Sequence, residues 1–274
     1  MSVDPLVFWR ESLAEWAIPE AILSRAPESP WTLPSDLFAR RADLQIKRRG
    51  GLSLRRAEEA LAPRGTVLDV GAGAGAASLP LAALTSELVA VDGDPAMLAE
   101  LRKRADALEL PVTTVEGAWP GAADRTSVCD VAICSHVLYN VPDLGPFLEA
   151  LDSHANRRVV IEITASHPVG ALNPLWLRFH DLRRPERPTW EDAAAAIRAI
   201  GLSPTIEHET TGEGNPSAAT YEALVAWTRR RLCLDASRDQ EVSDALVDLG
   251  MVPDQPETWS LRPRELAILW WDRR

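Results

Sequence analysis

The chain has 274 residues, of which 46% are hydrophobic and 25% charged, which is enough for one large α/β domain with appended helices. Its net charge of −11 and isoelectric point near 5.0 argue against broad electrostatic binding to nucleic acid, although they allow a local basic patch. No apolar run approaches the length of a bilayer span, and the N-terminus lacks the pattern of a secretion signal. We therefore expect a soluble cytoplasmic protein with no membrane contact.

The three cysteines give no sign of a metal site or of a disulfide framework. Cys129, Cys134 and Cys233 lack the paired spacing that either would need. We expect them to be small buried hydrophobic residues in a reducing compartment. The sequence therefore predicts no metal centre.

Residues 1–60 are predicted to form an N-terminal helical cap. Apolar residues recur at near-helical spacing from Pro5, and a proline-rich loop from Pro27 to Pro34 interrupts the pattern. A basic stretch from Arg40 to Arg49 is interpreted as a solvated face, with contact to a phosphate-bearing acceptor as the alternative. A short helix is predicted from Ser53 to Leu61, with Ser53 as its N-cap.

The stretch from Thr66 to Ala76 reads Thr-Val-Leu-Asp-Val-Gly-Ala-Gly-Ala-Gly-Ala and joins a buried-strand pattern to three alternating glycines. Glycine allows positive φ and lets the backbone come close to a ligand. A helix predicted from Ala77 to Leu84 would direct its free N–H groups at the same place. The pattern indicates a nucleotide site at Gly71, Gly73 and Gly75.

A second predicted strand, from Glu87 to Val91, ends in Asp92. This residue lies about 20 residues beyond the glycines, the spacing at which an acidic side chain meets ribose hydroxyls. The spacing alone also fits a dinucleotide-binding enzyme. Asp69 separates the two interpretations, because a carboxylate two residues before Gly71 would repel a pyrophosphate and attract an ammonium group.

The segment Asp69-Val-Gly-Ala-Gly-Ala-Gly75, followed by the strand that ends in Asp92, resembles the class I S-adenosylmethionine-dependent methyltransferases. The first motif of that family reads acidic-x-Gly-x-Gly-x-Gly, and its ligand carries an amino group, a sulfonium and a ribose. The resemblance implies S-adenosyl-L-methionine as the cofactor. It also implies an α/β fold with a doubly wound, seven-stranded, mostly parallel Rossmann-like sheet and an antiparallel last strand.

The rest of the chain supplies the elements of such a fold. Further strands are predicted over residues 111–115, 128–134, 157–163, 203–209 and 266–271, and helices over 94–108, 145–151, 189–200, 218–234 and 239–249. We expect the methyltransferase domain to span residues 61–274. Within it, residues 165–188 are too long and irregular for a simple connection and are predicted to be an acceptor-binding insertion.

The resemblance assigns the cofactor contacts by position. They are Asp69, Gly71, Gly73, Gly75, Asp92, Gly117, Ala118, Trp119 and Ser135. The segment from Gly117 to Trp119 follows the third strand, where the family contacts adenine. For Trp119, packing within the loop is an equally weighted alternative.

Two candidate catalytic residues, His136 and Tyr139, follow the fourth strand. Open α/β sheets bind ligands outside the carboxyl ends of their strands, which places both residues beside the expected methyl group. A structural role for His136 is the alternative to a role as general base. The candidate acceptor contacts are Trp31, His167, Trp176, His180 and Arg183.

Methyl transfer is an in-line displacement at carbon, so alignment of the acceptor with the methyl group is the main requirement and a base is optional. The sequence lacks the Asn/Asp-Pro-Pro-Tyr/Phe loop of adenine or glutamine methylation and the proline-linked cysteine of cytosine methylation. We therefore predict methyl transfer to oxygen or nitrogen of a small-molecule acceptor. An RNA methyltransferase and a non-catalytic S-adenosylmethionine-binding regulatory protein are the alternatives.

Overall fold

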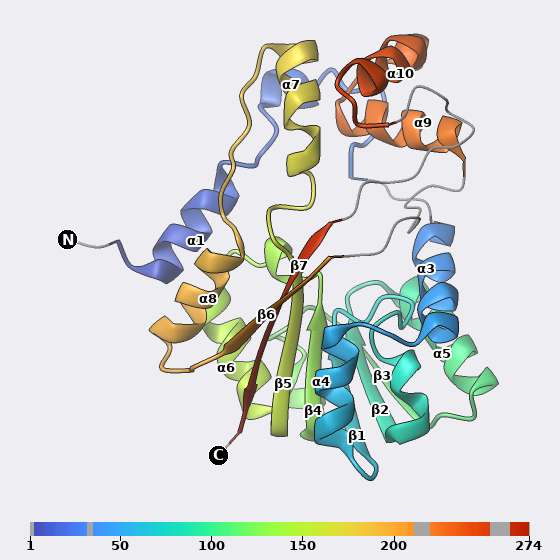
Figure 1. Ribbon diagram of the computed structural model, residues 1–274, viewed down its shortest axis with the longest axis vertical. Helices are drawn as coiled ribbons and strands as arrows, with labels where there is room; N and C mark the ends of the chain where they lie inside the picture. Colours follow the sequence, from blue (N-terminus) through green and yellow to red (C-terminus); the bar gives the residue numbers. More distant parts are fainter. Residues whose placement is uncertain (1–2, 32–34, 211–219, 253–263, 274) are drawn as a thin grey trace.

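The computed structural model describes residues 3–31, 35–210, 220–252 and 264–273. Its centre is a seven-stranded sheet in the order β3-β2-β1-β4-β5-β7-β6 (Figure 1). The strands are β1 (Gly65–Val70), β2 (Thr85–Asp92), β3 (Val112–Glu116), β4 (Cys129–Ser135), β5 (Ala155–Thr164), β6 (Thr205–Thr210) and β7 (Glu265–Asp272). Strands β1 to β5 are parallel to one another, and β7 runs antiparallel to both β5 and β6. The predicted fold, mostly parallel with an antiparallel last strand, is confirmed.

The side chains of the central strands alternate between two hydrophobic clusters, one on each face of the sheet. In β1, Leu68 and Val70 belong to one cluster and Val67 to the other. Since successive side chains of a strand point to opposite faces, a sheet covered on both sides needs strands that are almost continuously apolar. The exception in β1 is Asp69, a buried carboxylate in the centre of the sheet.

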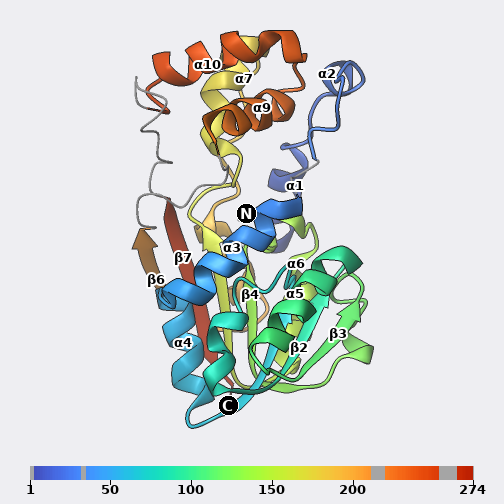
Figure 2. The same ribbon diagram turned by 90° about the vertical axis from the view of Figure 1, so that its right-hand side faces the viewer.

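Helices cover both faces of the sheet (Figure 2). One face carries α1 (Pro5–Ala14), α6 (Leu144–Ser153) and α8 (Trp190–Ala199), which pack against one another, and α6 also packs on β5. The opposite face carries α3 (Ser35–Arg48), α4 (Leu52–Leu61) and α5 (Pro95–Ala107). Two of these helices have capped N-termini, because Asp94 accepts from Ala96 N at 2.8 Å and Thr189 forms a capping box with Asp192.

Three further helices, α7 (Asn173–His180), α9 (Tyr221–Arg231) and α10 (Asp239–Asp248), form a group that we call the helical lobe. It lies beyond the carboxyl ends of the parallel strands (Figures 1 and 2). The lobe has its own hydrophobic cluster, which includes Trp176 and receives side chains from the short helix α2 (Glu20–Leu23). The fold therefore places a second layer of helices above the edge of the sheet where ligands bind in such folds.

The helices of the predicted N-terminal cap lie in separate places. Helix α1 packs on α6 and α8, α2 joins the helical lobe, and α3 and α4 cover the opposite face of the sheet. The end of the proline-rich loop at Pro34 and the predicted helix start at Ala218 lie outside the described residues.

The helix predicted from Ala77 to Leu84 is wrong in type and in starting point. The segment contains a six-residue 3₁₀ helix, η1 (Leu79–Leu84). Pro80 explains the difference, because it has no N–H to donate and disfavours the α conformation at the residue before it. The glycine loop therefore leads into a series of turns and a 3₁₀ helix.

The predicted N-cap of α4 is also wrong. The helix begins at Leu52, and the cap residue Gly51 offers no side chain. Leu52 N instead donates to Glu209 Oε2 of β6 at 2.7 Å, so a carboxylate from a distant strand takes the place of the cap. The hydroxyl of Ser53 is directed at a second carboxylate, that of Glu162 in β5.

Helix α1 is part of the main core, so replacing its buried tryptophan is expected to lower the stability of the fold strongly. Trp9 is 0% exposed, donates Nε1–H to Val141 O at 2.8 Å and stacks on Tyr139. We expect Trp9→Ala to lower the free energy of unfolding by about 3–5 kcal/mol, because it leaves a cavity and an unpaired carbonyl. Trp31, which is 55% exposed, is the matched control, and Trp31→Ala is expected to change stability by less than about 1 kcal/mol. Denaturant unfolding measures both, and equal losses would contradict the structure.

Candidate active site

The three glycines of the loop after β1 all have positive φ, but they serve different purposes. A Cβ on Gly71 would lie 2.3 Å from Val137 Cγ2, and one on Gly75 would lie 2.5 Å from Leu79 Cδ1. Both positions therefore need glycine for packing as well as for backbone conformation. A Cβ on Gly73, where φ is 53°, would meet no atom within 4 Å. Gly73 is thus the glycine whose Cα faces open space that a ligand can occupy.

Asp92 ends β2 directly beside this loop. Its Oδ2 accepts from Gly73 N at 2.8 Å, and its Oδ1 accepts from Asp94 N at 2.9 Å. The carboxylate thereby fixes both the glycine loop and the start of α5. Each oxygen of an ionised carboxylate has a second lone pair, so Asp92 can also accept from the hydroxyls of a ribose.

Asp69 is a buried carboxyl group without a hydrogen-bond partner among the described residues. It is 1% exposed, and neither of its oxygens has a partner there. Burial raises its pKa to about 7, an effect that the nearby Ser78 hydroxyl opposes and the charge of Asp92 increases. An ionised carboxylate in this position is destabilising unless a cation comes within reach.

The loop after β3 is bonded to the backbone of Asp92, but its tryptophan turns away. Gly117 N donates to Asp92 O at 2.9 Å. Trp119 is 9% exposed and donates Nε1–H to Phe147 O at 3.1 Å, whereas Ala118 is exposed. This geometry favours the packing interpretation of Trp119 and leaves Gly117 and Ala118 beside the site.

The fourth strand ends in a cluster of polar side chains around Glu162. His136 has a φ of 60°, uncommon for a residue other than glycine, and its N–H donates to Glu162 O at 2.7 Å. His136 Nε2 lies 3.1 Å from Glu162 Oε1, the same oxygen that accepts from Ser135 Oγ at 3.1 Å. The hydroxyl of Ser53 donates to the other carboxylate oxygen. Ser135, predicted as a cofactor contact, is thus directed at Glu162.

The charges of this cluster follow from its burial and its partners. Burial and the neighbouring guanidinium of Arg41 lower the pKa of His136 below its ordinary value. Burial alone would raise the pKa of Glu162, but hydrogen bonds from His136 and Ser53 and the charge of Arg41 hold it at about 2. At neutral pH the pair is therefore a neutral imidazole beside an ionised carboxylate.

Glu162 was missed by the sequence analysis. Its partners come from α4, β4 and the residue after β4, which are far apart in the chain. The sequence signal that could have identified Glu162 is a charged residue within the otherwise apolar half of β5, Val-Val-Ile-Glu-Ile.

Tyr139 and His167 form an aromatic group next to this cluster. Tyr139 is buried, and its hydroxyl donates to Thr164 O at 2.9 Å, so this hydroxyl is engaged by the backbone. His167 stacks on Trp16 with ring centroids 3.9 Å apart, and its Nδ1 is buried without a partner in the described part of the chain. His167 borders a cavity of about 260 Å³ at the end of β5, together with Thr164, Ala165, Ser166, Pro168, Ala171, Arg264 and Glu265.

The other candidate acceptor contacts are not brought to this cavity. Trp176 is 3% exposed inside the helical lobe, and His180 Nε2 lies 2.7 Å from Leu232 O. Trp31 and Arg183 are exposed. An acceptor role for these four residues stays a prediction.

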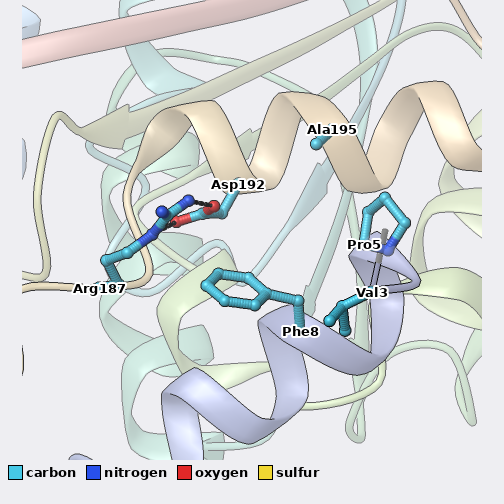
Figure 3. Close-up of a pocket in the computed structure, with 6 residues that line it drawn as sticks. All are labelled: Val3, Pro5, Phe8, Arg187, Asp192 and Ala195. Carbon is cyan, nitrogen blue, oxygen red and sulfur yellow. Dashed lines mark hydrogen bonds and ion pairs between the residues drawn. The ribbon is translucent and has the colours of Figure 1, made fainter. Parts of the chain in front are cut away.

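A second hollow, of about 270 Å³, lies in the seam between α1 and α8 (Figure 3). It is lined by Val3, Pro5, Phe8, Arg187, Asp192 and Ala195. Arg187 forms an ion pair with Asp192, and its guanidinium lies 4.6 Å from the centre of the Phe8 ring. None of the predicted cofactor, catalytic or acceptor residues lines this hollow, whereas His167 lines the cavity at β5, so we treat the hollow as a packing feature.

Comparison with known protein families identifies the domain around the glycine loop. A family model described as "Methyltransferase domain" matches residues 67–156. Residues 67–156 therefore form a methyltransferase domain. The matched range of this methyltransferase includes the glycine loop, Asp92, the loop after β3 and His136, and its cofactor is S-adenosylmethionine.

Solved structures share the fold of the methyltransferase at low sequence identity. The YcgJ protein from Bacillus subtilis has a TM-score of 0.52 and 15% identity, over 86% of this chain and 98% of that chain. A putative methyltransferase from Bacillus halodurans C-125 also has a TM-score of 0.52, with 16% identity, over 80% of this chain and 96% of that chain. A search of curated proteins finds no significant match.

Three features of the structure fit S-adenosylmethionine. Gly73 leaves open space at its Cα, and Asp92 presents carboxylate lone pairs beside it. Asp69 supplies an unpartnered carboxylate for which a cationic amino group is a suitable counter-charge. In the described part of the methyltransferase, no cluster of three or more His, Cys, Asp or Glu side chains could hold a metal ion, and no helix is long and apolar enough to span a bilayer.

The open space at Gly73 predicts the effect of a side chain there. We expect Gly73→Val to abolish the thermal stabilisation by S-adenosylhomocysteine, because the side chain would occupy the ligand's space. Gly201→Val is the matched control, because Gly201 also has positive φ and no atom within 4 Å of its Cβ, but follows α8. Both variants should lose about 1–2 kcal/mol of stability through backbone strain. Loss of ligand response in both, or in neither, would contradict the assignment.

Asp69 predicts a pH dependence whose sign follows from its pKa. The carboxyl group keeps its proton up to about pH 7 when folded but releases it near 3.8 when unfolded, so its contribution to stability falls as pH rises between these values. A cationic ligand needs the ionised form. We therefore expect affinity for S-adenosylhomocysteine to rise between pH 5.5 and 7.5, by up to about tenfold per pH unit below the pKa.

The Asp69→Asn variant distinguishes the titration of Asp69 from the titration of other groups. The amide should weaken ligand binding and remove most of the pH dependence, because it cannot become an anion. Relative to unliganded wild type, the unliganded variant should gain stability as the pH rises from 5 to 8. Calorimetric titration at several pH values measures the affinity, and an unchanged pH dependence in Asp69→Asn would contradict the contact.

Proposed function

We propose that this methyltransferase transfers a methyl group from S-adenosylmethionine to an oxygen or nitrogen atom of a small-molecule acceptor. The observation that supports this most directly is the position of His136 at the carboxyl end of β4, with its Nε2 3.1 Å from Glu162 Oε1. S-adenosylmethionine supplies a methyl carbon on a sulfonium, an electrophile that needs alignment with its acceptor more than activation.

We assign different residues of the chain to holding the cofactor and to accepting the proton. We assign Gly73, Asp92 and Asp69 to holding the cofactor, for the reasons of space and charge given above. Methylation of a hydroxyl or an amine releases one proton from the acceptor atom. A neutral imidazole can accept that proton near neutral pH, and we assign this role to His136.

The cavity beside β5 supports a small acceptor. Its volume of about 260 Å³ lies just below the usual range of sites for drug-sized ligands. The Trp16–His167 stack forms an aromatic wall next to it, and Arg264 borders it with a guanidinium. An acceptor with a planar body and a carboxylate would match these two features.

Three of the four arginines of the predicted acceptor-binding insertion argue against the RNA alternative. Arg178 pairs with Asp248, and Arg187 pairs with Asp192. Arg184 donates to the carbonyl oxygens of Trp16 and Ala17. These side chains therefore hold the insertion onto the lobe and the N-terminal segment, whereas an RNA clamp would present several of them to phosphates.

His136→Asn tests the proposed function. With methyl-labelled S-adenosylmethionine and a fractionated cell extract, we expect wild type to label the small-molecule fraction. The variant should do so about 10²-fold more slowly, with unchanged affinity for S-adenosylhomocysteine. His208→Asn is the control. His208 of β6 packs on Trp190 of α8, so this variant should keep full turnover. Label in the RNA fraction would support an RNA methyltransferase, and binding without any transfer would support the regulatory alternative.

A further inference from the structure

We propose that Glu162 is a positioning residue, which holds His136 in the tautomer with its proton on Nε2 and leaves Nδ1 to accept the proton that the acceptor releases. The inference rests on the proposed function, because it assigns a role within the same site. It concerns a residue that touches neither the acceptor nor the cofactor and that acts through the imidazole.

The contacts of the pair decide the tautomer. An ionised carboxylate only accepts hydrogen bonds, so the Nε2 that lies 3.1 Å from Glu162 Oε1 must carry the hydrogen. A neutral imidazole then has its lone pair on Nδ1. The His136 side chain is 21% exposed, so part of the ring remains open to a bound acceptor.

Glu162 is itself held from several sides. Ser135 Oγ and Ser53 Oγ both donate to its carboxylate, and its own carbonyl accepts from His136 N. Ser53 lies in the first turn of α4, where the helix dipole favours a negative charge. The side chain is 14% exposed, so these bonds are largely shielded from water. The carboxylate therefore has little freedom to turn away from the imidazole.

The charged groups that face the pair come from three elements. Arg41 of α3 and Arg264 before β7 oppose a positive charge on His136, as burial does, and Glu162 of β5 favours it. The balance keeps the free imidazole neutral and ready to take a proton. Once the imidazolium forms, the carboxylate beside Nε2 stabilises it, as the buried aspartate does in a Ser-His-Asp triad.

The proton balance is simple. Methylation replaces one hydrogen on the acceptor's oxygen or nitrogen by the methyl group, while the sulfur of the cofactor keeps the electron pair of the broken S–C bond. The released proton moves to Nδ1 of His136, which becomes an imidazolium. The hydrogen on Nε2 stays in its bond to Glu162, which remains ionised. Solvent takes the proton from Nδ1 after the product leaves.

NMR of the imidazole nitrogens tests the pair without any acceptor. Protein labelled with ¹⁵N-histidine and saturated with S-adenosylhomocysteine is titrated with pH, and His136→Asn assigns the resonances among the five histidines. In wild type we expect the Nε2–H tautomer and a pKa below the ordinary value. In Glu162→Gln we expect a mixture of tautomers and a still lower pKa, because the charge that favours the imidazolium is gone.

The matched control is Glu209→Gln. Glu209 is a second carboxylate at the N-terminus of α4, where it accepts from Leu52 N, and it has no hydrogen bond to His136. We expect its removal to leave the tautomer and pKa of His136 unchanged. An Nδ1–H tautomer in wild type, or a His136 titration that is the same in wild type and Glu162→Gln, would overturn the proposal.

Turnover supplies the second readout. Glu162→Gln should lower the rate of methyl transfer about 10²-fold, keep the affinity for S-adenosylhomocysteine and move the acidic limb of the pH–rate profile to lower pH. If this variant does not fold, Ser135→Ala and Ser53→Ala each remove one donor to Glu162, and both should increase the minor tautomer. An unchanged tautomer in both would count against the proposal.

The two proposals fail in different ways. Wild-type protein with the expected tautomer but no labelled small molecule would refute the proposed function and leave the pair intact. If small molecules are labelled but Glu162→Gln changes neither the His136 titration nor the pH–rate profile, the proposed role of Glu162 is refuted and the proposed function is not.

Discussion

The site depends on one carboxylate, that of Glu162, to which two separate parts of the chain bond at the carboxyl edge of the sheet. Ser135 and His136 come from the end of β4, Ser53 comes from α4, and Glu162 itself belongs to β5. The positive φ of His136 would be unfavourable in isolation, and two bonds to Glu162, one from its backbone and one from its ring, hold it in place. The local strain at the end of β4 is thus offset by the polar cluster that also fixes the imidazole.

The sequence was sufficient for most of the fold because the signals were local. Apolar strand patterns each act within a few residues, and the structure confirms the strands they predicted, whereas the segment after the glycine loop is a 3₁₀ helix. The predicted cofactor residues Gly73 and Asp92 are in direct contact for the same reason, since strand ends of one βαβ unit meet. The contact between Ser53 and Glu162 could not be predicted without knowing which strand lies beside which helix. The cap that Glu209 supplies from a distant strand also has no local sequence signal.

The helical lobe shows why residue type alone does not decide which residues contact an acceptor. Aromatic and basic residues in the insertion suggested a binding surface, yet Trp176 packs inside the lobe, and the guanidinium of Arg184 lies 5.0 Å from the centre of its ring. A tryptophan and an arginine stabilise a helical layer through the same cation–π contact that they offer a ligand. Only burial distinguishes the two uses, and burial here depends on α9 and α10, which follow in the chain after β6.

Two buried carboxyl groups at the same edge of the sheet behave in opposite ways, and the difference separates the two halves of the site. Glu162 has donors on both oxygens and a nearby guanidinium, which keep its pKa at about 2, so it is ionised before any ligand arrives. Asp69 has no hydrogen-bond partner in the described chain, and burial raises its pKa to about 7. On the proposed assignment, the acceptor half is therefore electrostatically complete in the protein alone, whereas the cofactor half is completed only when a cation binds. Because an ionised Asp69 is destabilising without that cation, we propose that binding energy from the cofactor's amino group must first offset this cost.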